Sequence, residues 1–290
     1  MPHCPVCDLD SSRPFAQLQG GGFWTCPHCS LVFSLGVERW AKDMLSRDAV
    51  VRALQPMRIR NFNRILDDVV TRVPAGGRLL EVGSSTGVFL DFARRRGLDA
   101  YGIEPDPYFV EHARRRFPDV ADRILEGFFP DVRPPGQFHA ICFNDVFEHI
   151  PDALRILDAC LGMLAPGGVV SMSLPSADGF FFTLARRLHR LGYDYPLVRM
   201  LQLNYPYPHL YYFSPRSLQA LARARHLRLA RLAPLEIVSA DSIADRVAMD
   251  VAPAWQRGMR TLFGYGVFAA WRVMPRSVAR PDLLHVVFAA

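Results

Sequence analysis

Lysine is almost absent from this sequence: Lys42 is the only one among 34 basic residues. The other basic residues are arginines, and because such a bias is typical of genomic base composition, none of them is interpreted individually as a phosphate ligand. They are scattered through predicted helices, without a long block of like charge or an interleaved row of aromatic side chains, so nucleic acid is an unlikely partner on these grounds. The formal net charge of +6 permits acidic substrates or an anionic membrane surface without selecting between them.

The sequence also lacks a long apolar segment. The uncharged run at residues 159–177 is interrupted by Pro166-Gly167-Gly168 and by Pro175, so it is predicted to form a helix end, a turn and a buried strand, not a membrane span. No apolar signal region follows Met1, and a cytoplasmic location is therefore expected. With 290 residues, 50% of them hydrophobic, the chain can bury a substantial core.

Cysteine is scarce, but four of the six cysteines form two Cys-x-x-Cys pairs separated by eighteen residues. Each pair is expected to fold into a tight turn, and a short hairpin between the pairs brings the four sulfurs together around one metal ion. Four thiolates favour zinc, with a single iron as the alternative, and a site closed by four protein ligands has a structural role. The predicted ligands are Cys4, Cys7, Cys26 and Cys29, in a zinc ribbon at residues 1–35.

From residue 78 onward, predicted strands and helices alternate. This alternation implies right-handed crossovers and a mostly parallel seven-stranded sheet that is covered on both faces, with a ligand above the carboxyl ends of its strands. The last strand is expected to be antiparallel. The predicted strands are 78–82, 98–104, 123–125, 138–143, 169–174, 227–238 and 282–289, and the predicted helices are 87–96, 106–117, 153–164 and 215–225.

The stretch from Leu79 to Leu90 carries the strongest functional signal. An apolar strand runs into Glu81, and two glycines, Gly83 and Gly87, bracket a tight turn before an apolar helix, so a cofactor can lie against bare backbone. Glu104 ends the next strand, where an acidic side chain can accept both hydroxyls of a ribose. The full Gly-x-Gly-x-x-Gly pattern is missing, and the Glu81 carboxylate repels phosphate but suits a cationic sulfonium or ammonium group.

On these residues the chain resembles the class I S-adenosylmethionine (SAM)-dependent methyltransferases, over about residues 76–290. Further motifs follow in the same order: Gly102-Ile103-Glu104-Pro105, the run Asp145 to Asp152, Leu164-Ala165-Pro166-Gly167-Gly168, and the run His209 to Ser214. The resemblance implies an α/β, Rossmann-like methyltransferase domain, similar to the type 11/23 small-molecule and sugar methyltransferases. Its departure is Ser85, where most members have glycine. The SAM-binding residues that it implies are Glu81, Gly83, Ser85, Gly87, Glu104, Glu126, Gly127, Phe128 and Asn144.

Two further segments complete the predicted domain plan. Residues 36–75 are expected to form a helical linker or cap before the methyltransferase domain at 76–290. Residues 176–212 are too long for an ordinary strand-to-helix connection and are rich in phenylalanine and tyrosine, so this aromatic insertion is expected to cover the substrate, with His209 and Tyr211 facing the acceptor. Simple packing of the aromatic rings is the alternative.

Methyl transfer to a hydroxyl group requires that the hydroxyl lose its proton. His149 is the candidate base, because the unperturbed pKa of histidine, about 6.5, suits proton abstraction at cellular pH, and Glu148 or Asp145 is the candidate that orients it. The alternative remains that the Glu148-His149 pair only builds the start of a helix, as in relatives whose chemistry needs no base.

The segment from Trp255 to Arg276 mixes arginines with large apolar side chains. Such a segment can rest in an anionic membrane interface, which adds peripheral contact with the inner face of the membrane to the expected location. It can equally cover the core of the domain.

The sequence therefore predicts a SAM-dependent methyltransferase that acts on a hydroxyl or amino group of a small molecule or sugar, in surface-polysaccharide or secondary-metabolite assembly. The sugar assignment rests on resemblance to ribbon-bearing sugar methyltransferases. Three alternatives stay open: a quinone-type O-methyltransferase, an RNA methyltransferase, and a catalytically inactive protein in which the zinc ribbon is an interaction module. The oligomeric state is not predicted.

Overall fold

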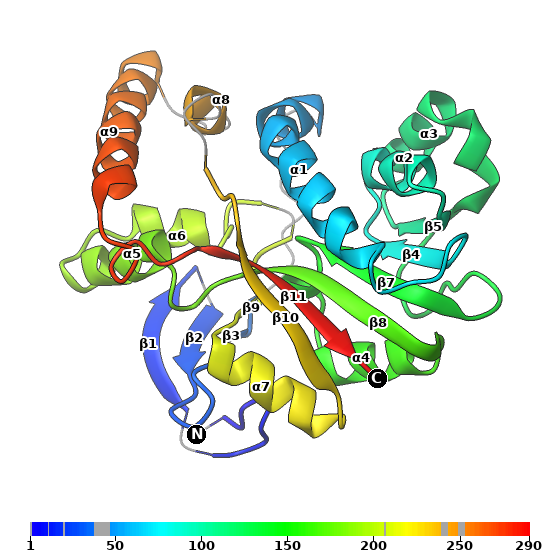
Figure 1. The fold of residues 1–290 in the computed structure, drawn as a ribbon. Helices are drawn as coiled ribbons and strands as arrows, with labels where there is room; N and C mark the ends of the chain where they lie inside the picture. Colours follow the sequence, from blue (N-terminus) through cyan, green and yellow to red (C-terminus); the bar gives the residue numbers. More distant parts are fainter. Residues whose placement is uncertain are drawn as a thin grey trace.

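Two sheets organise the chain (Figure 1). The computed structural model describes residues 2–10, 12–19, 21–37, 47–205, 207–238, 243–248 and 253–290. In these residues the larger sheet has seven strands in the order β10-β11-β8-β7-β4-β5-β6, and the smaller has four in the order β1-β2-β3-β9.

The larger sheet is parallel except at one strand. β11 runs antiparallel to both of its neighbours, β8 and β10, and the remaining pairs are parallel. The prediction of a mostly parallel seven-stranded sheet with an antiparallel last strand is therefore confirmed. Its strands are Arg78–Val82 (β4), Asp99–Glu104 (β5), Ile124–Glu126 (β6), Phe138–Asn144 (β7), Leu164–Pro175 (β8), Arg228–Leu235 (β10) and Leu283–Ala289 (β11).

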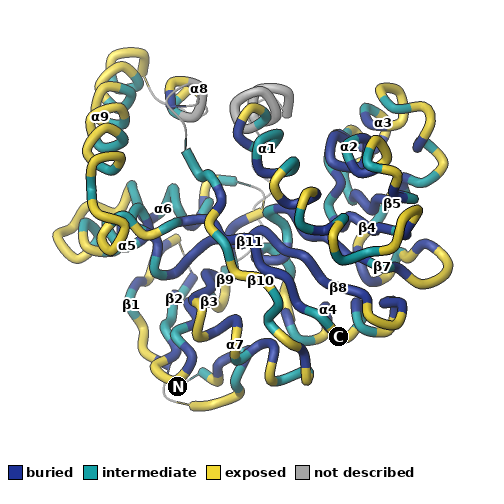
Figure 2. The backbone as a smooth tube through the Cα atoms, in the orientation of Figure 1, coloured by how far each residue is buried: buried dark blue, intermediate teal, exposed yellow. Residues whose placement is uncertain are grey.

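Helices cover both faces of this sheet, as the alternating pattern predicts (Figure 1). One face packs against α1, α2 and α3, and the other packs against α4 and α7; each interface has its own cluster of buried apolar side chains. Figure 2 shows the strands as the buried centre and α9 as an exposed helix at the periphery. The helices are Arg47–Val69 (α1), Val88–Arg95 (α2), Pro107–Arg116 (α3), Ala153–Leu161 (α4), Phe180–Arg190 (α5), Tyr195–Met200 (α6), Pro215–Ala224 (α7), Ile243–Ala248 (α8) and Ala254–Val273 (α9), with short 3₁₀ turns at Pro118–Arg123 (η1) and Phe147–His149 (η2).

One predicted boundary is wrong. The helix expected to reach Leu164 ends at Leu161 with Gly162 as its C-cap, and Leu164 already pairs with Phe138 in the sheet. The Pro166-Gly167-Gly168 turn is an irregularity inside β8, because the register shifts between the pairs Phe138–Leu164 and Ala140–Val169. In the sequence, the Pro-Gly-Gly residues of such a bulge have the same pattern as a turn between a helix and a strand.

The small sheet is built on the cysteine-rich segment. Arg13–Leu18 (β1), Gly21–Thr25 (β2) and Val32–Leu35 (β3) form an antiparallel meander, which includes the predicted hairpin between the cysteine pairs. Its fourth strand, Tyr211–Tyr212 (β9), comes from the predicted insertion and pairs with β3. The sheet also shares an apolar cluster with α4, α7 and the larger sheet.

Candidate functional site

A cavity of about 740 Å³ lies at the carboxyl ends of β4, β5 and β7. The middle of α1 and the segment from Arg199 to Tyr212 also contribute side chains to its lining. Parallel strands deliver their terminal residues to one edge, and this edge is where open α/β sheets bind ligands. The cavity therefore has the position that the sequence motifs predict.

The turn after β4 keeps the floor of the cavity close to the backbone. Gly83 has φ +76°, a conformation that strongly favours glycine, and a Cβ added there would come within 2.5 Å of Val146. Gly87 also has positive φ and is the N-cap of α2. Ser85 adopts φ +46° despite its Cβ, so the position where most relatives have glycine is left-handed here too.

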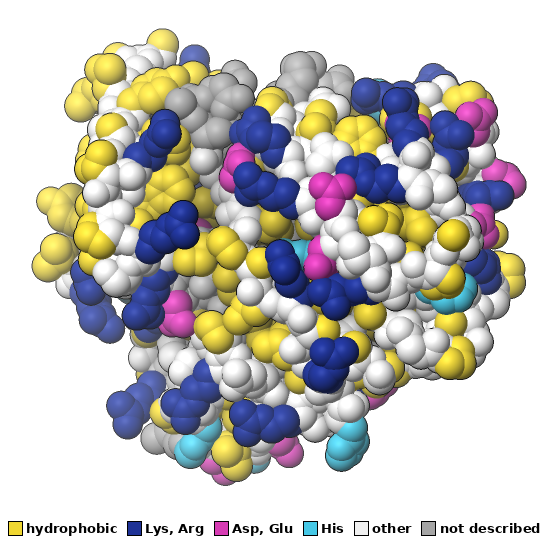
Figure 3. Space-filling view, in the orientation of Figure 1, with side chains coloured by type: hydrophobic (Ala, Val, Ile, Leu, Met, Phe, Trp, Pro, Cys, Tyr) yellow, Lys and Arg dark blue, Asp and Glu magenta, His cyan; other side chains and the backbone are white. Residues whose placement is uncertain are grey.

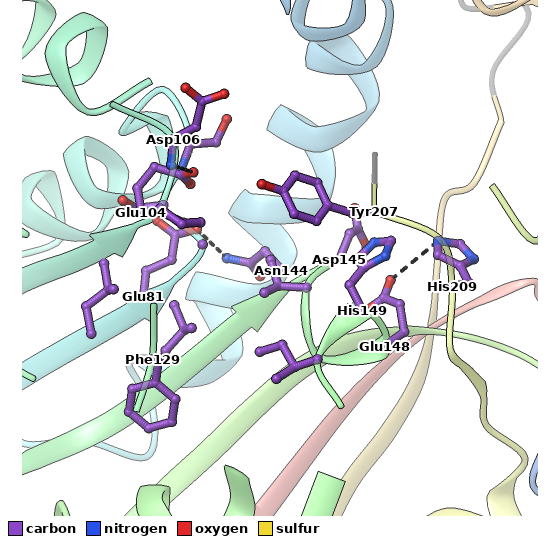
Figure 4. Close-up of a pocket in the computed structure, with 18 of the residues that line it drawn as sticks. Glu81, Glu104, Asp106, Phe129, Asn144, Asp145, Glu148, His149, Tyr207 and His209 are labelled. Atoms are coloured by element: carbon purple, nitrogen blue, oxygen red, sulfur yellow. Dashed lines mark hydrogen bonds and ion pairs between the residues drawn. The ribbon is translucent and has the colours of Figure 1, made fainter. Parts of the chain in front are cut away.

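Two buried carboxylates face this floor. Oε1 of Glu81 accepts a hydrogen bond from the side-chain amide of Asn144 at 2.8 Å, whereas the buried Oε2 has no hydrogen-bond partner among the described residues (Figure 4). The pKa of Glu81 is raised to about 8, mainly by burial; the nearby Glu104 contributes to this shift, and Asn144 opposes it. An unpartnered buried carboxylate beside a second one makes a site for a cation.

Glu104 is held by backbone donors at the end of β5. Its Oε2 accepts from the N–H of Ser85 at 2.8 Å and its Oε1 from the N–H of Asp106 at 2.9 Å. Burial raises the pKa of Glu104, and these two hydrogen bonds oppose the shift. The carboxylate is thus fixed in orientation at the place where the sequence predicts a ribose-binding residue.

Arg58, on α1, is a site residue that the sequence reasoning missed. Its Nε lies 3.8 Å from Oδ2 of Asp145, and it lines the cavity with Glu81 and Glu104, whose pKa values its charge lowers. Asp145, at φ +56°, is fixed by Ser173: Oγ of Ser173 accepts from the Asp145 N–H at 2.9 Å and donates to Oδ1 at 2.6 Å. In the sequence Arg58 is one scattered arginine in an expected linker, and no local motif marks it.

The far side of the cavity holds Glu148, His149 and His209 (Figure 4). Nδ1 of His149 lies 3.0 Å from the carbonyl oxygen of Pro208, which can only accept, so Nδ1 carries the proton and Nε2 of the neutral ring carries the lone pair. The ring of His149 also packs 4.7 Å from that of His209. The hydrogen bond that fixes Nδ1 of His149 is thus made to a backbone carbonyl, whereas the sequence analysis named Glu148 or Asp145 for this role.

Burial favours the neutral forms of His209 and Glu148. Burial lowers the pKa of His209 well below its usual range, and burial raises that of Glu148 well above. The Tyr212 hydroxyl donates to the carbonyl of Met200 and accepts from Nδ1 of His209 at 3.0 Å. Nε2 of His209 then faces Oε1 of Glu148 at 3.9 Å.

The cavity brings most of the sequence-predicted site residues together. Gly87 and Glu126 do not line it, because Gly87 begins α2 and Glu126 is exposed at the end of β6. On strand β9, Tyr212 lines the cavity and Tyr211 packs into the apolar cluster. The predicted residues in the lining are Glu81, Gly83, Ser85, Glu104, Gly127, Phe128, Asn144, Asp145, Glu148, His149 and His209.

The four N-terminal cysteines also converge. Sγ of Cys4 lies 3.5 Å from that of Cys29, Sγ of Cys7 lies 3.6 Å from that of Cys26, and all four sulfurs are within 4.8 Å of one another. Zinc–sulfur bonds of about 2.3 Å place tetrahedral sulfurs roughly 3.8 Å apart, so the cluster fits one zinc ion. The separate Cys142 and Cys160 are fully buried, as expected for small apolar residues.

Comparison with known proteins identifies the family of the chain. A family profile described as a methyltransferase domain, type 23, matches residues 55–232, which is more than half of the chain. The chain belongs to this family of SAM-dependent methyltransferases. The family implies SAM as the cofactor of the cavity.

Two relatives illustrate the similarity of this methyltransferase to ubiquinone biosynthesis O-methyltransferases. The protein from Xanthomonas campestris pv. campestris (strain B100) is 30% identical over 186 residues, which cover 62% of this chain and 72% of the relative. The protein from Xylella fastidiosa (strain 9a5c) is 30% identical over 163 residues, which cover 52% and 58%.

Solved structures support the fold of the methyltransferase. A chain described as a sarcosine dimethylglycine methyltransferase from Galdieria sulphuraria matches with a TM-score of 0.52 at 14% identity, over 80% of this chain and 85% of that one. The geranyl diphosphate C-methyltransferase from Streptomyces coelicolor A3(2) matches with a TM-score of 0.50 at 14% identity, over 88% and 89%.

Proposed function

We propose that this methyltransferase transfers the methyl group of SAM to a ring-borne hydroxyl group of a small molecule, with His149 as the base. The observation that carries the proposal is the buried Oε2 of Glu81, which faces the cavity floor without a hydrogen-bond partner among the described residues. A cationic ligand gives this oxygen a counter-charge. When bound, SAM supplies an electrophilic methyl group on a sulfonium sulfur.

The residues of the cavity floor fit the three polar parts of SAM. Glu81 offers a carboxylate to the ammonium group, and Glu104, already oriented by two backbone N–H groups, offers its oxygens to the ribose hydroxyls. Arg58 offers a guanidinium to the carboxylate of the methionine part. Gly83, Ser85, Gly127, Phe128 and Asn144 lie close enough to line the same ligand, with Gly87 and Glu126 as supports behind it.

His149 has the geometry of a general base. Its proton is held at Nδ1 by Pro208, so Nε2 can take the proton of an acceptor hydroxyl. His209 packs against His149, and burial favours its neutral form, so it adds no positive charge that would oppose the imidazolium formed on His149. Asp145 lies between the two halves of the cavity and is tied to Arg58.

The acceptor is proposed to be a ring that bears a hydroxyl. Tyr205, Tyr207 and Tyr212 line the far side of the cavity with Met200 and Ile150, a surface suited to stacking on a phenolic or sugar ring. The O-methyltransferase relatives favour the phenolic ring, and the surface-polysaccharide or secondary-metabolite sugar of the sequence prediction is the runner-up.

Binding and turnover test the proposal separately. Calorimetry with SAM and S-adenosylhomocysteine (SAH) is expected to give saturable binding, and Glu81→Gln to weaken it. In a panel of catechols, hydroquinones and sugars, His149→Ala is expected to keep SAH affinity and to lower methylation at least about 100-fold. Binding of neither compound would support the inactive alternative, and unchanged turnover in His149→Ala would remove the base.

We also propose that Cys4, Cys7, Cys26 and Cys29 hold a structural zinc ion. The sulfur spacing and the tight turns of the two pairs support this assignment. Elemental analysis is expected to find one zinc per chain, and Cys26→Ser is expected to lose it; iron in its place would correct the metal.

Peripheral contact with an anionic membrane is a further part of the proposal. α9 buries none of its residues; Trp255 is 66% and Leu262 is 74% exposed. Figure 3 shows hydrophobic side chains gathered along this helix. Residues 251–281 contain five arginines and no acidic residue, so their charge complements anionic lipid. No described helix is long and apolar enough to cross a membrane.

Vesicle flotation tests this contact. Binding is expected to vesicles that contain phosphatidylglycerol and not to pure phosphatidylcholine, and Trp255→Ser with Leu262→Ser is expected to abolish it. Leu35→Ser, at an apolar side chain of β3 that is 47% exposed, is the matched control and keeps binding. Dimerisation that the double variant abolishes, without vesicle binding, would assign the helix to a second copy instead.

A further inference from the structure

Residues 208–214 are hydrogen-bonded to Glu148 and His149. The backbone N–H of Leu210 donates to the carbonyl oxygen of Glu148 at 2.8 Å, and the carbonyl of Pro208 fixes Nδ1 of His149. Between them, His209 projects toward the side chain of Glu148 (Figure 4). The orientation of both residues in the pair therefore depends on where this segment lies.

The same segment is hydrogen-bonded to the four-cysteine sheet. The carbonyl of Leu210 accepts from the N–H of Ser34 at 2.9 Å, and β9 continues the pairing with β3 for two residues. Past β9, Oγ of Ser214 donates to the carbonyl of Cys29 at 3.2 Å. Seven consecutive residues thus reach from the side chain of His149 to the backbone of a predicted metal ligand.

Packing reinforces this connection. Three of the four cysteines, Cys4, Cys26 and Cys29, are buried in the same apolar cluster as Phe147, which begins the turn that carries Glu148 and His149. The interior of the cluster is close-packed, so a shift of the cysteine turns displaces this turn as well. By contrast, Glu81 and Glu104 are hydrogen-bonded to residues of the larger sheet and its turns.

We propose that the metal-loaded cysteine cluster positions the acceptor half of the active site through β9, with Leu210 as the positioning residue, and leaves the cofactor half independent. The inference rests on the proposed function for the roles of the two halves. Metal binding orders the cysteine turns, the turns fix β3, and β3 fixes the segment that sets the tautomer of His149. The four-cysteine sheet then stabilises the acceptor half of the active site through its strand β9.

Chelation of the metal is the first test. After removal of zinc, SAH affinity is expected to stay within about twofold, since distant sites couple weakly. In the metal-loaded protein, each of these histidine rings is expected to have one protonated and one bare nitrogen. After chelation, the ¹⁵N signals of His149 and His209, assigned with single His→Gln variants, are expected to depart from this pattern. Unchanged histidine signals would overturn the inference. Loss of SAH binding together with loss of the circular dichroism signal of the folded protein would also overturn the inference, because the cluster would then stabilise the whole protein.

Leu210→Pro is the second test, because it removes the N–H that donates to Glu148 and keeps every cysteine and histidine. By reciprocity, zinc affinity in competition with a chelator is expected to fall by about fivefold or more, and the histidine signals to change as they do on chelation. Gln17→Ala, at an exposed side chain on the sheet strand farthest from β9, is the control and changes neither. If Leu210→Pro does not fold, Tyr212→Phe replaces it as the test. This variant is expected to change only the tautomer of His209 and the zinc affinity. If the folded variant has wild-type values for both, the inference is overturned.

The readouts keep the two proposals apart. Failure of zinc-loaded wild-type protein to bind SAM or SAH would remove the proposed methyl transfer and leave the zinc-to-histidine connection measurable. Normal SAM binding, together with histidine ¹⁵N signals that do not change on removal of the metal, would overturn only the proposed link between the cysteine cluster and His149.

Discussion

Asn144 donates its side-chain amide to Oε1 of Glu81 at 2.8 Å, across the adjacent parallel strands β7 and β4. This hydrogen bond favours the ionised form of a carboxyl group whose pKa burial has raised to about 8. The second oxygen of Glu81 is left for a ligand. The pair therefore sets both the charge and the direction of the carboxylate on the cavity floor.

Cofactor binding is predicted to depend on pH through Glu81. Because the carboxyl group is largely protonated in the free site below its pKa of about 8 and ionised beside a cation, SAM binding should release a proton at neutral pH. Affinity is then expected to rise as pH increases from 6.5 to 8.5, with a slope of at most about tenfold per pH unit. Calorimetry in two buffers of different ionisation enthalpy measures the proton released.

The variants separate this titration from that of the ligand. Glu81→Gln is expected to remove the protein's share of the proton release, and Asn144→Leu is expected to raise the pKa of Glu81 and weaken binding at pH 7.5. Equal proton release in wild type and Glu81→Gln would assign the whole effect to SAM.

Ser85 is predicted to tolerate glycine better than a branched residue. Its φ of +46° costs free energy in any residue with a Cβ, so Ser85→Gly is expected to stabilise the fold or leave it unchanged, within about 1 kcal/mol. Its N–H still donates to Glu104, so SAH affinity should be kept. Ser85→Val is expected to lower both stability and affinity. Thermal unfolding and calorimetry check this, and a glycine variant that loses SAH would give the hydroxyl a direct role.

Local sequence signals were sufficient for most of the sheet and the cofactor half of the site. Apolar runs that end in Glu81 and Glu104 place both carboxylates at one edge, because parallel strands end together. Ser214-Pro215 predicts the start of α7, and the structure has Ser214 there in a capping box with Ser217. Each of these signals lies within a few residues of the structure that it predicts.

Contacts between distant segments could not be predicted in this way. β9 is only two residues long, and its pairing with β3 joins positions about 180 residues apart, so no periodicity marks it. Arg58 reaches the cavity because α1 packs beside α2, and the sequence of α1 alone does not reveal that contact. The acceptor half depends on such contacts, which is why the sequence analysis named His149 with Glu148 or Asp145 but not the Pro208 carbonyl that fixes its Nδ1.

Acid is predicted to destabilise the fold partly through His285, on β11. The ring is buried, with Nε2 3.0 Å from Oγ of Ser171, and burial lowers its pKa to about 4. The unfolded chain binds this proton from about pH 6.5 downward, so the contribution is present above 6.5 and is lost as pH falls toward 4, by roughly 2 kcal/mol at pH 5. Urea unfolding at pH 7.5 and pH 5 should show a smaller loss in His285→Gln; an equal loss would assign the effect to other groups.

Asp282 is predicted to stabilise the first turn of α5 from a position about 100 residues away. Its two carboxyl oxygens accept from the backbone N–H groups of Phe181 and Phe182, and the helix has no side-chain cap of its own. Asp282→Ala leaves these donors without their partner and is expected to lower the free energy of unfolding by about 1–3 kcal/mol. Asp178→Ala, close to the same helix start, is the control and should stay within about 0.5 kcal/mol.

Since burial raises the pKa of Asp282 to about 6, its neutral form is favoured in the fold, and the contribution of this titration to stability declines as pH rises from about 4 through 6. Urea unfolding of both variants at pH 5 and pH 7.5 measures the two effects, and a variant Asp282→Ala as stable as wild type at both values would show that solvent replaces the cap.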